Sequence, residues 1–269
     1  MLPRALPMED EEVSAELQKQ LRRQGIKILT GMKFERMEKT NGMVKITLIP
    51  TESPNDQNTH SLVTLEGDKI LLAVGVRSNV ENLGLEGLGV KVERGFVTVN
   101  LAMQTSVPNI YAIGDVTGKL LLAHCASAQG EIAVESIVGR EVRPLIYDNL
   151  PRGTYSQPQV GSMGLTEAHA RARGHEVRVG KFLFHANGKA LAVGDYEGFV
   201  KIVADAQYGE VLGAHIIGYN AAELLPEISL ALTLESTYSE IGHTIHPHPT
   251  LSETIMEAAR AVDGEAIHI

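Results

Sequence analysis

Near its C-terminus the chain carries a histidine and a glutamate at a spacing that suits acid–base chemistry. Residues 246–253 read His-Pro-His-Pro-Thr-Leu-Ser-Glu, so His248 precedes Glu253 by five residues. Pro249 biases His248 toward an extended backbone. A carboxylate beside an imidazole fixes its tautomer and stabilises the imidazolium. The pair therefore predicts a side chain that takes up and returns a proton near neutral pH.

The same residues also have a purely structural interpretation. Thr250 stands three residues before Glu253, and Thr-x-x-Glu is the pattern of a capping box, in which the glutamate accepts from the backbone N–H of the cap residue. Thr250 would then cap a helix over residues 251–261. Spacing alone leaves both interpretations open. His246 is interpreted as a structural neighbour rather than a second base.

A second candidate site follows a strand that we expect over residues 109–113. A carboxylate at the carboxyl end of such a strand, here Asp115, lies where α/β folds bind ligands, and it can accept hydrogen bonds from sugar hydroxyls. Gly114 lets the chain pass close to a bound molecule. A helix expected over 121–138 begins directly afterwards, and its free N–H groups would favour electron density on a flavin ring. The alternative is an ordinary strand and turn before a helix. The residues expected to open that helix are Leu121, Leu122, Ala123 and His124.

Composition limits the classes of function. The chain has 269 residues, 43% of them hydrophobic, and a net charge of −9 without a basic stripe, which argues against nucleic acid as a partner. No window approaches the length of a membrane span. Histidines lack metal-ligand spacing, so no metal site is expected. Cys125 is the single cysteine, which fits a reducing compartment and predicts a cytoplasmic protein.

Periodicity divides the chain into two kinds of region. Before residue 144 it predicts a helix over 9–24, a polar loop over 50–60, and strands. Those strands are expected over 26–29, 44–49, 61–65, 69–74, 96–99 and 109–113. Residues 144–151 are a candidate linker. The remainder is rich in strands that alternate with helices in blocks, which favours an α+β domain. Its strands are expected over 153–163, 181–186, 199–204 and 211–217, and its helices over 167–173, 221–234 and 251–261.

Several motifs, and the order in which they occur along the chain, resemble the C-terminal part of the pyridine nucleotide–disulfide oxidoreductases, in their lipoamide dehydrogenase branch. The resemblance covers essentially the whole chain. It rests on residues 73–79 (Ala-Val-Gly-Val-Arg-Ser-Asn), the Gly-Asp at 114–115, and residues 121–124, 155–167, 212–218 and 248–253. It implies an α/β fold, with a partial FAD/NAD-binding Rossmann-like region followed by an α+β dimerisation domain. The implied boundaries are 1–80 for half of the NAD-binding domain, 81–147 for a returning FAD-binding segment, and 148–269 for dimerisation.

The resemblance also implies cofactors, partners and roles. His248 would exchange protons with a dithiol, oriented by Glu253, and would act on the flavin and disulfide of the other subunit of a homodimer. Asp115 would contact the flavin ribitol of FAD, with residues 121–124 along the ring. Gly75 and Phe34 would lie near the adenosine of NAD. The implied activity is that of a dihydrolipoyl dehydrogenase, which serves lipoyl-bearing subunits of 2-oxoacid dehydrogenase complexes or the glycine cleavage system.

Two features of that family are missing from the sequence. It contains no Gly-x-Gly-x-x-Gly and no pair of cysteines. The family carries both in its N-terminal part, so we expect this polypeptide alone to be inactive. Two alternatives stay open: a non-catalytic or split-gene dimerisation subunit, and a related flavin disulfide reductase with another substrate.

Overall fold

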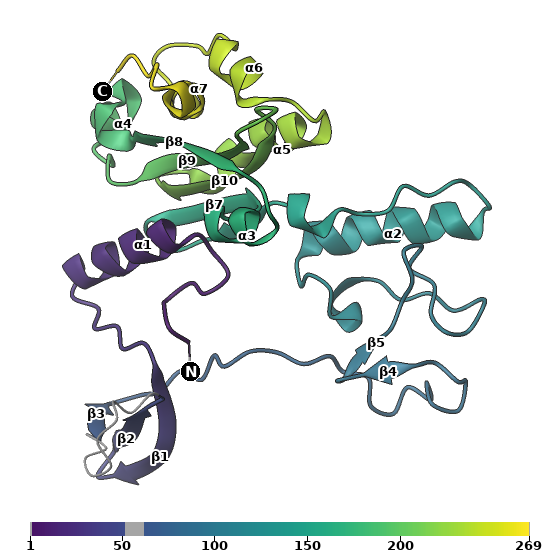
Figure 1. Ribbon diagram of the computed structural model, residues 1–269. Helices are drawn as coiled ribbons and strands as arrows, with labels where there is room; N and C mark the ends of the chain where they lie inside the picture. The colour runs from purple at the N-terminus through teal and green to yellow at the C-terminus, as the bar shows by residue number, and fades with distance from the viewer. Residues whose placement is uncertain (1, 52–61, 269) are drawn as a thin grey trace. The chain divides into compact units, whose positions relative to one another are not determined.

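The computed structural model describes residues 2–51 and 62–268 (Figure 1). These form two compact units. One combines Met1–Leu72 with Pro151–Ile269, and the other is Ala73–Leu150. The division into 1–80, 81–147 and 148–269 is a different partition, by family domain, and stays a prediction.

A five-stranded antiparallel sheet forms the centre of the first unit. Its order is β6-β7-β10-β9-β8. The strands are β6 (Arg152–Thr154), β7 (Gln159–Gly164), β8 (Val177–Leu183), β9 (Phe199–Asp205) and β10 (Val211–Gly218). Nearly every residue of the two central strands β9 and β10 is buried, as expected for strands covered on both faces. The strands predicted over 199–204 and 211–217 are confirmed, and the one predicted over 153–163 is broken into β6 and β7. Of the strand predicted over 181–186 only the first half belongs to β8, because Phe184–Ala186 form a 3-10 helix.

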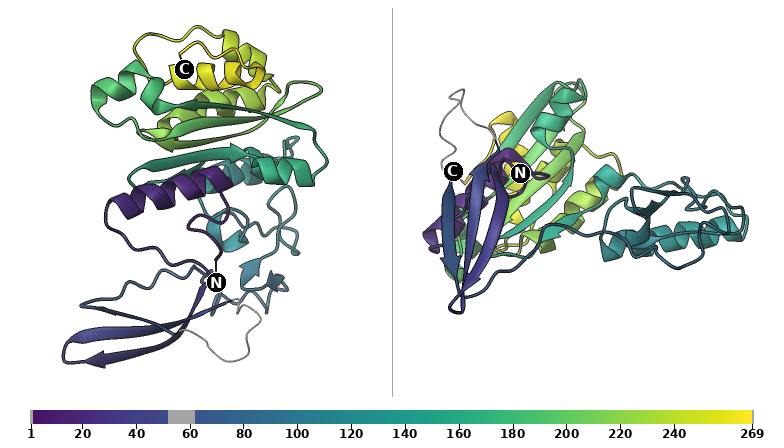
Figure 2. Two further views of the ribbon diagram at one scale, coloured as in Figure 1. Left: turned by 60° about the vertical axis from the view of Figure 1, so that its left-hand side comes forward. Right: turned by 90° about the horizontal axis from the view of Figure 1, so that it is seen from below.

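Helices cover both faces of this sheet (Figure 2). On one face α5 (Leu225–Thr233) and α7 (Glu253–Arg260) close the largest apolar core, which includes Ile202, Ile216 and Ile255. On the other face lie α1 (Glu11–Arg23) and α3 (Glu167–Ala172). Two short helices were not predicted from the sequence. They are α4 (Gly188–Val193) and α6 (Tyr238–His243).

A three-stranded antiparallel meander follows α1, in the order β1-β2-β3. Its strands are β1 (Met32–Thr40), β2 (Met43–Pro50) and β3 (Val63–Gly67). The strand predicted over 26–29 is wrong, because the ladder begins only where Met32 pairs with Pro50. Most of the loop predicted over 50–60 lies outside the described residues.

The second unit contains a small hairpin and one long helix. The elements are β4 (Val92–Glu93), β5 (Phe96–Val97), the 3-10 helices η1 (Gly114–Thr117) and η2 (Tyr147–Asn149), and α2 (Ala123–Ile137). The strand predicted over 109–113 is wrong, since Tyr111 makes only an isolated bridge to Gln104. The strand predicted over 69–74 is also wrong, and Leu71 there is 92% exposed. Strands form by pairing, and no strand in the described ranges pairs with either segment.

Candidate functional site

The first candidate site lies where the chain enters α7. The Nδ1 atom of His248 lies 2.9 Å from Oε1 of Glu253, so the predicted pair is in contact. The Glu253 side chain is only 16% exposed, whereas that of His248 is 75% exposed. The carboxylate is therefore held within the fold and the imidazole is presented to solvent.

The Glu253 carboxylate contacts both the His248 ring and the backbone of Thr250. Its second oxygen, Oε2, accepts a hydrogen bond from the Thr250 backbone N–H at 2.8 Å. The predicted capping of the helix by the Thr250 side chain is wrong. The Thr250 hydroxyl donates to the Pro247 carbonyl instead, and α7 begins after Ser252 without a side-chain cap. One carboxylate thus links the turn to the imidazole, and that link fixes the position of the ring.

The electrostatics of the pair favour an ionised carboxylate. Burial of the Glu253 carboxyl alone would raise its pKa, but the Thr250 N–H and the His248 ring outweigh burial and hold the pKa below its ordinary value. Because an ionised carboxylate only accepts, Nδ1 of His248 must carry the proton in this contact. The neutral ring then presents Nε2 with a free lone pair, ready to accept a proton.

Neighbouring groups hold the turn that carries His248. Asn187 Nδ2 donates to the Thr250 carbonyl at 3.0 Å. His246, whose side chain is 5% exposed, lies 2.9 Å from Glu227 of α5 through Nε2, and its Nδ1 lies 2.9 Å from the Thr244 carbonyl. His246 is thus paired inside the fold, as a structural neighbour would be. Asn187 and Glu227 were not identified from the sequence, because nothing in their local pattern points to a segment 19 or more residues away.

The second candidate site lies in the second unit, at the turn that contains Gly114 and Asp115. The Gly114 N–H donates to Oε1 of Gln129 at 2.6 Å, and Gln129 Nε2 donates to the Tyr147 hydroxyl at 3.0 Å. Gln129 is fully buried. Sequence reasoning missed it, although a lone glutamine in a helix of small residues is a usable signal. The turn is therefore anchored from α2, while the Asp115 side chain is exposed.

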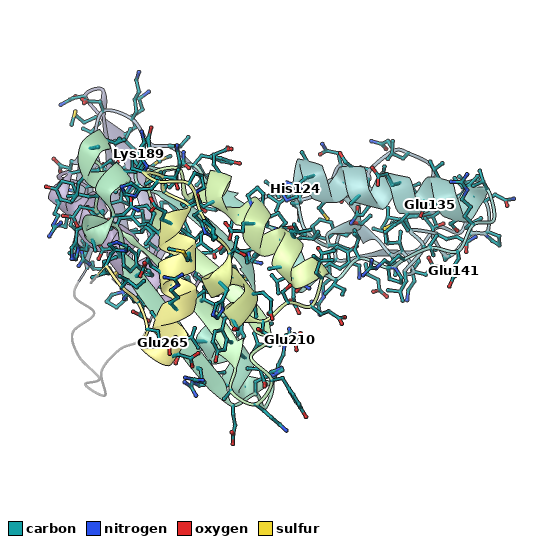
Figure 3. The ribbon with its side chains drawn as sticks, turned by 90° about the horizontal axis from the view of Figure 1, so that it is seen from above. His124, Glu135, Glu141, Lys189, Glu210 and Glu265 are labelled. Carbon is teal, nitrogen blue, oxygen red and sulfur yellow. The ribbon has the colours of Figure 1, made fainter. Side chains whose placement is uncertain are left out.

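The start of α2 lies close to this turn in sequence and in space. The helix begins at Ala123, so Leu121 and Leu122 precede it rather than open it. Its N-cap, Leu122, offers no side-chain hydrogen bond, and the first turn contains no acidic residue. Figure 3 labels His124 in the first turn and Glu135 toward the other end of the helix. An uncapped start leaves backbone N–H groups available to a ligand.

Cys125, in the first turn of α2, is fully buried. Burial raises the pKa of its thiol, and the negative charge of Asp115 raises it further. Because the thiolate is the reactive form, a buried thiol with a raised pKa is better suited to packing than to chemistry.

The two residues expected near a nucleotide adenosine lie apart from both sites in sequence. Gly75 has a φ of +119°, a conformation that side chains rarely adopt. Phe34 lies on β1 beside a register irregularity and is 49% exposed. Among the described residues, no contact of either one assigns it a role.

In the described part of the chain, no helix is long and apolar enough to cross a membrane. Nor does any group of three or more His, Cys, Asp or Glu side chains among the described residues form a cluster that could hold a metal ion.

Two family models match the chain. Residues 1–130 match the model described as pyridine nucleotide-disulphide oxidoreductase, and residues 150–259 match the dimerisation domain of the same group. The two matched ranges together leave out only short segments.

Curated relatives and solved structures agree with these matches. The chain is 48% identical to dihydrolipoyl dehydrogenase of Mycobacterium leprae and 46% identical to that of Bacillus subtilis, and it covers 56% and 55% of them, with 99% and 98% of the chain aligned. The chain thus spans about half the length of the curated relatives it matches. The crystal structure of LpdA from Mycobacterium tuberculosis matches with a TM-score of 0.84 at 28% identity, over 94% of this chain and 53% of that one. A flavoprotein disulfide reductase, RclA of Escherichia coli, shares the fold at 24% identity, with a TM-score of 0.82 over 94% of this chain and 56% of its own.

Proposed function

Because the chain belongs to the pyridine nucleotide-disulphide oxidoreductase family, we propose that it is the C-terminal part of an FAD-dependent dihydrolipoyl dehydrogenase that reduces NAD. The names of its relatives support this activity, and the α/β fold class with a C-terminal dimerisation domain agrees with it. The single observation that carries the proposal is the His248–Glu253 pair, with a partly buried carboxylate behind an exposed imidazole.

In this proposal His248 is the proton carrier. Oxidation of a dithiol to a disulfide releases two electrons and two protons, and a thiol must lose its proton before it attacks a disulfide. The free Nε2 of His248 takes that proton from the dihydrolipoyl thiol. The ionised Glu253 stabilises the resulting imidazolium and keeps Nδ1 from accepting the proton instead. In the reverse direction the imidazolium returns the proton to the leaving thiolate.

The second unit fits a flavin. Gly114 has a φ of +74°, and a Cβ there would lie only 3.3 Å from the Ala126 side chain, so glycine lets the turn pack closely against α2. The exposed Asp115 carboxylate suits ribitol hydroxyls, and the uncapped start of α2 suits an electron-rich ring edge. We assign FAD binding to Gly114, Asp115 and residues 121–124. Bound FAD would accept the two electrons of the dithiol and deliver them to NAD.

The remaining assignments rest on family resemblance. Gly75 and Phe34 are assigned to the adenosine side of NAD. The match of residues 150–259 to a dimerisation domain supports a homodimer, in which His248 serves the disulfide of the other subunit. The proposed partners are lipoyl-bearing subunits of 2-oxoacid dehydrogenase complexes or the glycine cleavage system. The proposal includes a cytoplasmic location.

The test compares three variants in the enzyme that contains this chain together with the N-terminal part of its relatives. His248→Gln is expected to lower kcat for dihydrolipoamide by about 10²–10⁴-fold, because it removes a general base. Glu253→Gln is expected to lower kcat less and to shift the acid limb of the kcat/KM profile to lower pH. The control is His243→Gln, an exposed imidazole that bonds Ser239 on its own helix. Unchanged kcat in His248→Gln, with FAD retained, would refute the assignment.

A further inference from the structure

A row of polar side chains crosses the whole five-stranded sheet on the face that α1 covers. Cross-strand pairing places Arg152 of β6 opposite Ser162, Ser162 opposite His215, His215 opposite Lys201, and Lys201 opposite Lys181 of β8. We call these five residues the cross-sheet row. Side chains that are direct partners in an antiparallel ladder lie on the same face. Three cations therefore stand in line on an otherwise apolar face.

The start of α1 presents three carboxylates to these three cations. Glu9 Oε1 lies 3.5 Å from Arg152 Nε, and both Asp10 oxygens lie 3.1 Å from Lys201 Nζ. Glu12 binds Lys201 through Oε1 at 2.7 Å and Lys181 through Oε2. Asp10 and Lys201 are 191 residues apart in sequence. The acids of one helix start thus match a surface built from distant strands.

Lys201 is the centre of this contact. Its side chain is only 2% exposed, and Glu167 of α3 adds a third carboxylate at 2.9 Å. Burial would lower the pKa of Lys201, but Glu12, Glu167 and Asp10 outweigh burial and raise it. A buried ammonium that loses its partners is strongly destabilising. The sheet therefore needs the acids of α1 to keep Lys201 inside.

The middle of the row is less complete. Two atoms of the row, Ser162 Oγ and His215 Nδ1, are buried without a hydrogen-bond partner among the described residues. The same holds for Oε2 of Glu9, which faces the row. Each such atom reduces the stability gained at that point. The attraction between the row and the acidic start of α1 is therefore concentrated around Lys201 rather than at Arg152.

Apolar contacts continue the same interface along the helix. Val13 and Leu17 of α1 pack on Val160, Phe199 and Ile217, and all five are at most 4% exposed. Gln20 and Arg23 also bond Glu197, just before β9. Without α1, the apolar side chains around the row would be exposed to water, which is unfavourable.

From these contacts we propose that the cross-sheet row is a docking surface for the acidic start of α1, and that α1 opens and closes as one cooperative unit with the five-stranded sheet, separately from the β1–β3 meander. The proposal does not depend on the reaction. It assigns residues 9–24 energetically to the C-terminal domain, although more than 120 residues separate them from it in sequence.

Native-state hydrogen exchange on the full chain tests this proposal. We expect peptides from α1, β9 and β10 to exchange within about 10-fold of one another, because one cooperative opening exposes them all. Asp10→Asn removes the charge but keeps an N-cap residue of equal rank. It is expected to accelerate exchange in α1, β9 and β10 together by at least 10-fold, with β1–β3 unchanged.

Further variants make the result decisive. Glu12→Gln should give the same pattern at smaller size, since Glu12 is 44% exposed, and Arg152→Gln a smaller effect still. Lys19→Met, on the exposed face of α1, is the matched control and should change nothing. Acceleration confined to α1, or equal rates in wild type and Asp10→Asn, would overturn the proposal. An α1 that exchanges 100-fold faster than β10 in the wild type would do the same.

Discussion

Strand β9 and the segment around residue 72 have similarly apolar sequences but opposite environments. In β9, Val200 and Ile202 are fully buried, whereas Leu71 and Leu72 are 92% and 77% exposed. β9 has β8 and β10 along its two edges and helices over both faces. The segment has no strand partner among the described residues. An apolar run therefore forms a buried strand only when other strands are present to pair with its edges.

The same contrast separates the two candidate sites. The His248–Glu253 pair lies in the region whose core is complete, and its geometry is fully formed. The residues assigned to FAD and NAD lie among elements that carry many exposed apolar side chains, such as Val74 and Val76. The chain covers 56% and 55% of two curated relatives, and we propose that a segment corresponding to the rest of their length supplies the partner strands.

The largest effect is expected from Lys201→Met, in the complete region. The substitution leaves Asp10 without a buried counter-ion, so it should lower the free energy of unfolding by about 3–5 kcal/mol. Lys91→Met removes an exposed pair with Glu93 and should change the stability far less, because exposed ion pairs contribute little. Urea denaturation followed by circular dichroism measures both. Equal losses in the two variants would contradict a buried cluster at Lys201.

A matched pair of truncations addresses the apolar contrast directly. Ile216→Ala creates a cavity in the sheet core and should cost about 2–5 kcal/mol. Leu72→Ala removes a side chain that is 77% exposed and should change stability of this chain by no more than about 0.5 kcal/mol. The denaturation midpoints of the two variants measure these stability losses. If Leu72→Ala cost as much as Ile216→Ala, residue 72 would be part of a packed core.

The smallest effect concerns pH. The pKa of Glu253 lies below its ordinary value in the folded chain because of the Thr250 N–H and His248, which outweigh burial. Its ionised form therefore stabilises the fold above the unfolded value of 4.5, and this contribution is lost as pH falls through the folded pKa. The stability difference between wild type and Glu253→Gln should shrink below pH 4.5. A difference that stays constant down to pH 3 would show that ionisation of Glu253 does not matter to folding.

Local patterns predicted what local interactions decide. The apolar stripe of Val13 and Leu17 predicted α1, and the apolar run after Gly198 predicted β9. Both patterns are local in the sequence. The spacing of His248 and Glu253 allowed their contact, and the family resemblance implied it. The fold class was predicted from the family resemblance, and the family matches confirm it.

Long-range partners decided the rest. The capping box expected at Thr250 is incomplete there, whereas the same Thr-x-x-Glu pattern at Thr237 forms a complete one and starts α6. The difference is the Thr250 hydroxyl, which donates to the Pro247 carbonyl, so the first turn of α7 receives no side-chain cap. The partners of Lys201 and Gln129 come from elsewhere in the chain, and no local pattern shows them.

We propose that this chain supplies the acid–base half of a dihydrolipoyl dehydrogenase. The most direct measurement is a flavin absorbance spectrum and a dihydrolipoamide–NAD assay, on the purified chain and then with the N-terminal part of the enzyme added. We expect neither flavin nor turnover from the chain alone, and both in combination, with turnover lost in His248→Gln while flavin stays. Turnover by the chain alone, or a combination that binds flavin and does not oxidise dihydrolipoamide, would contradict the claim.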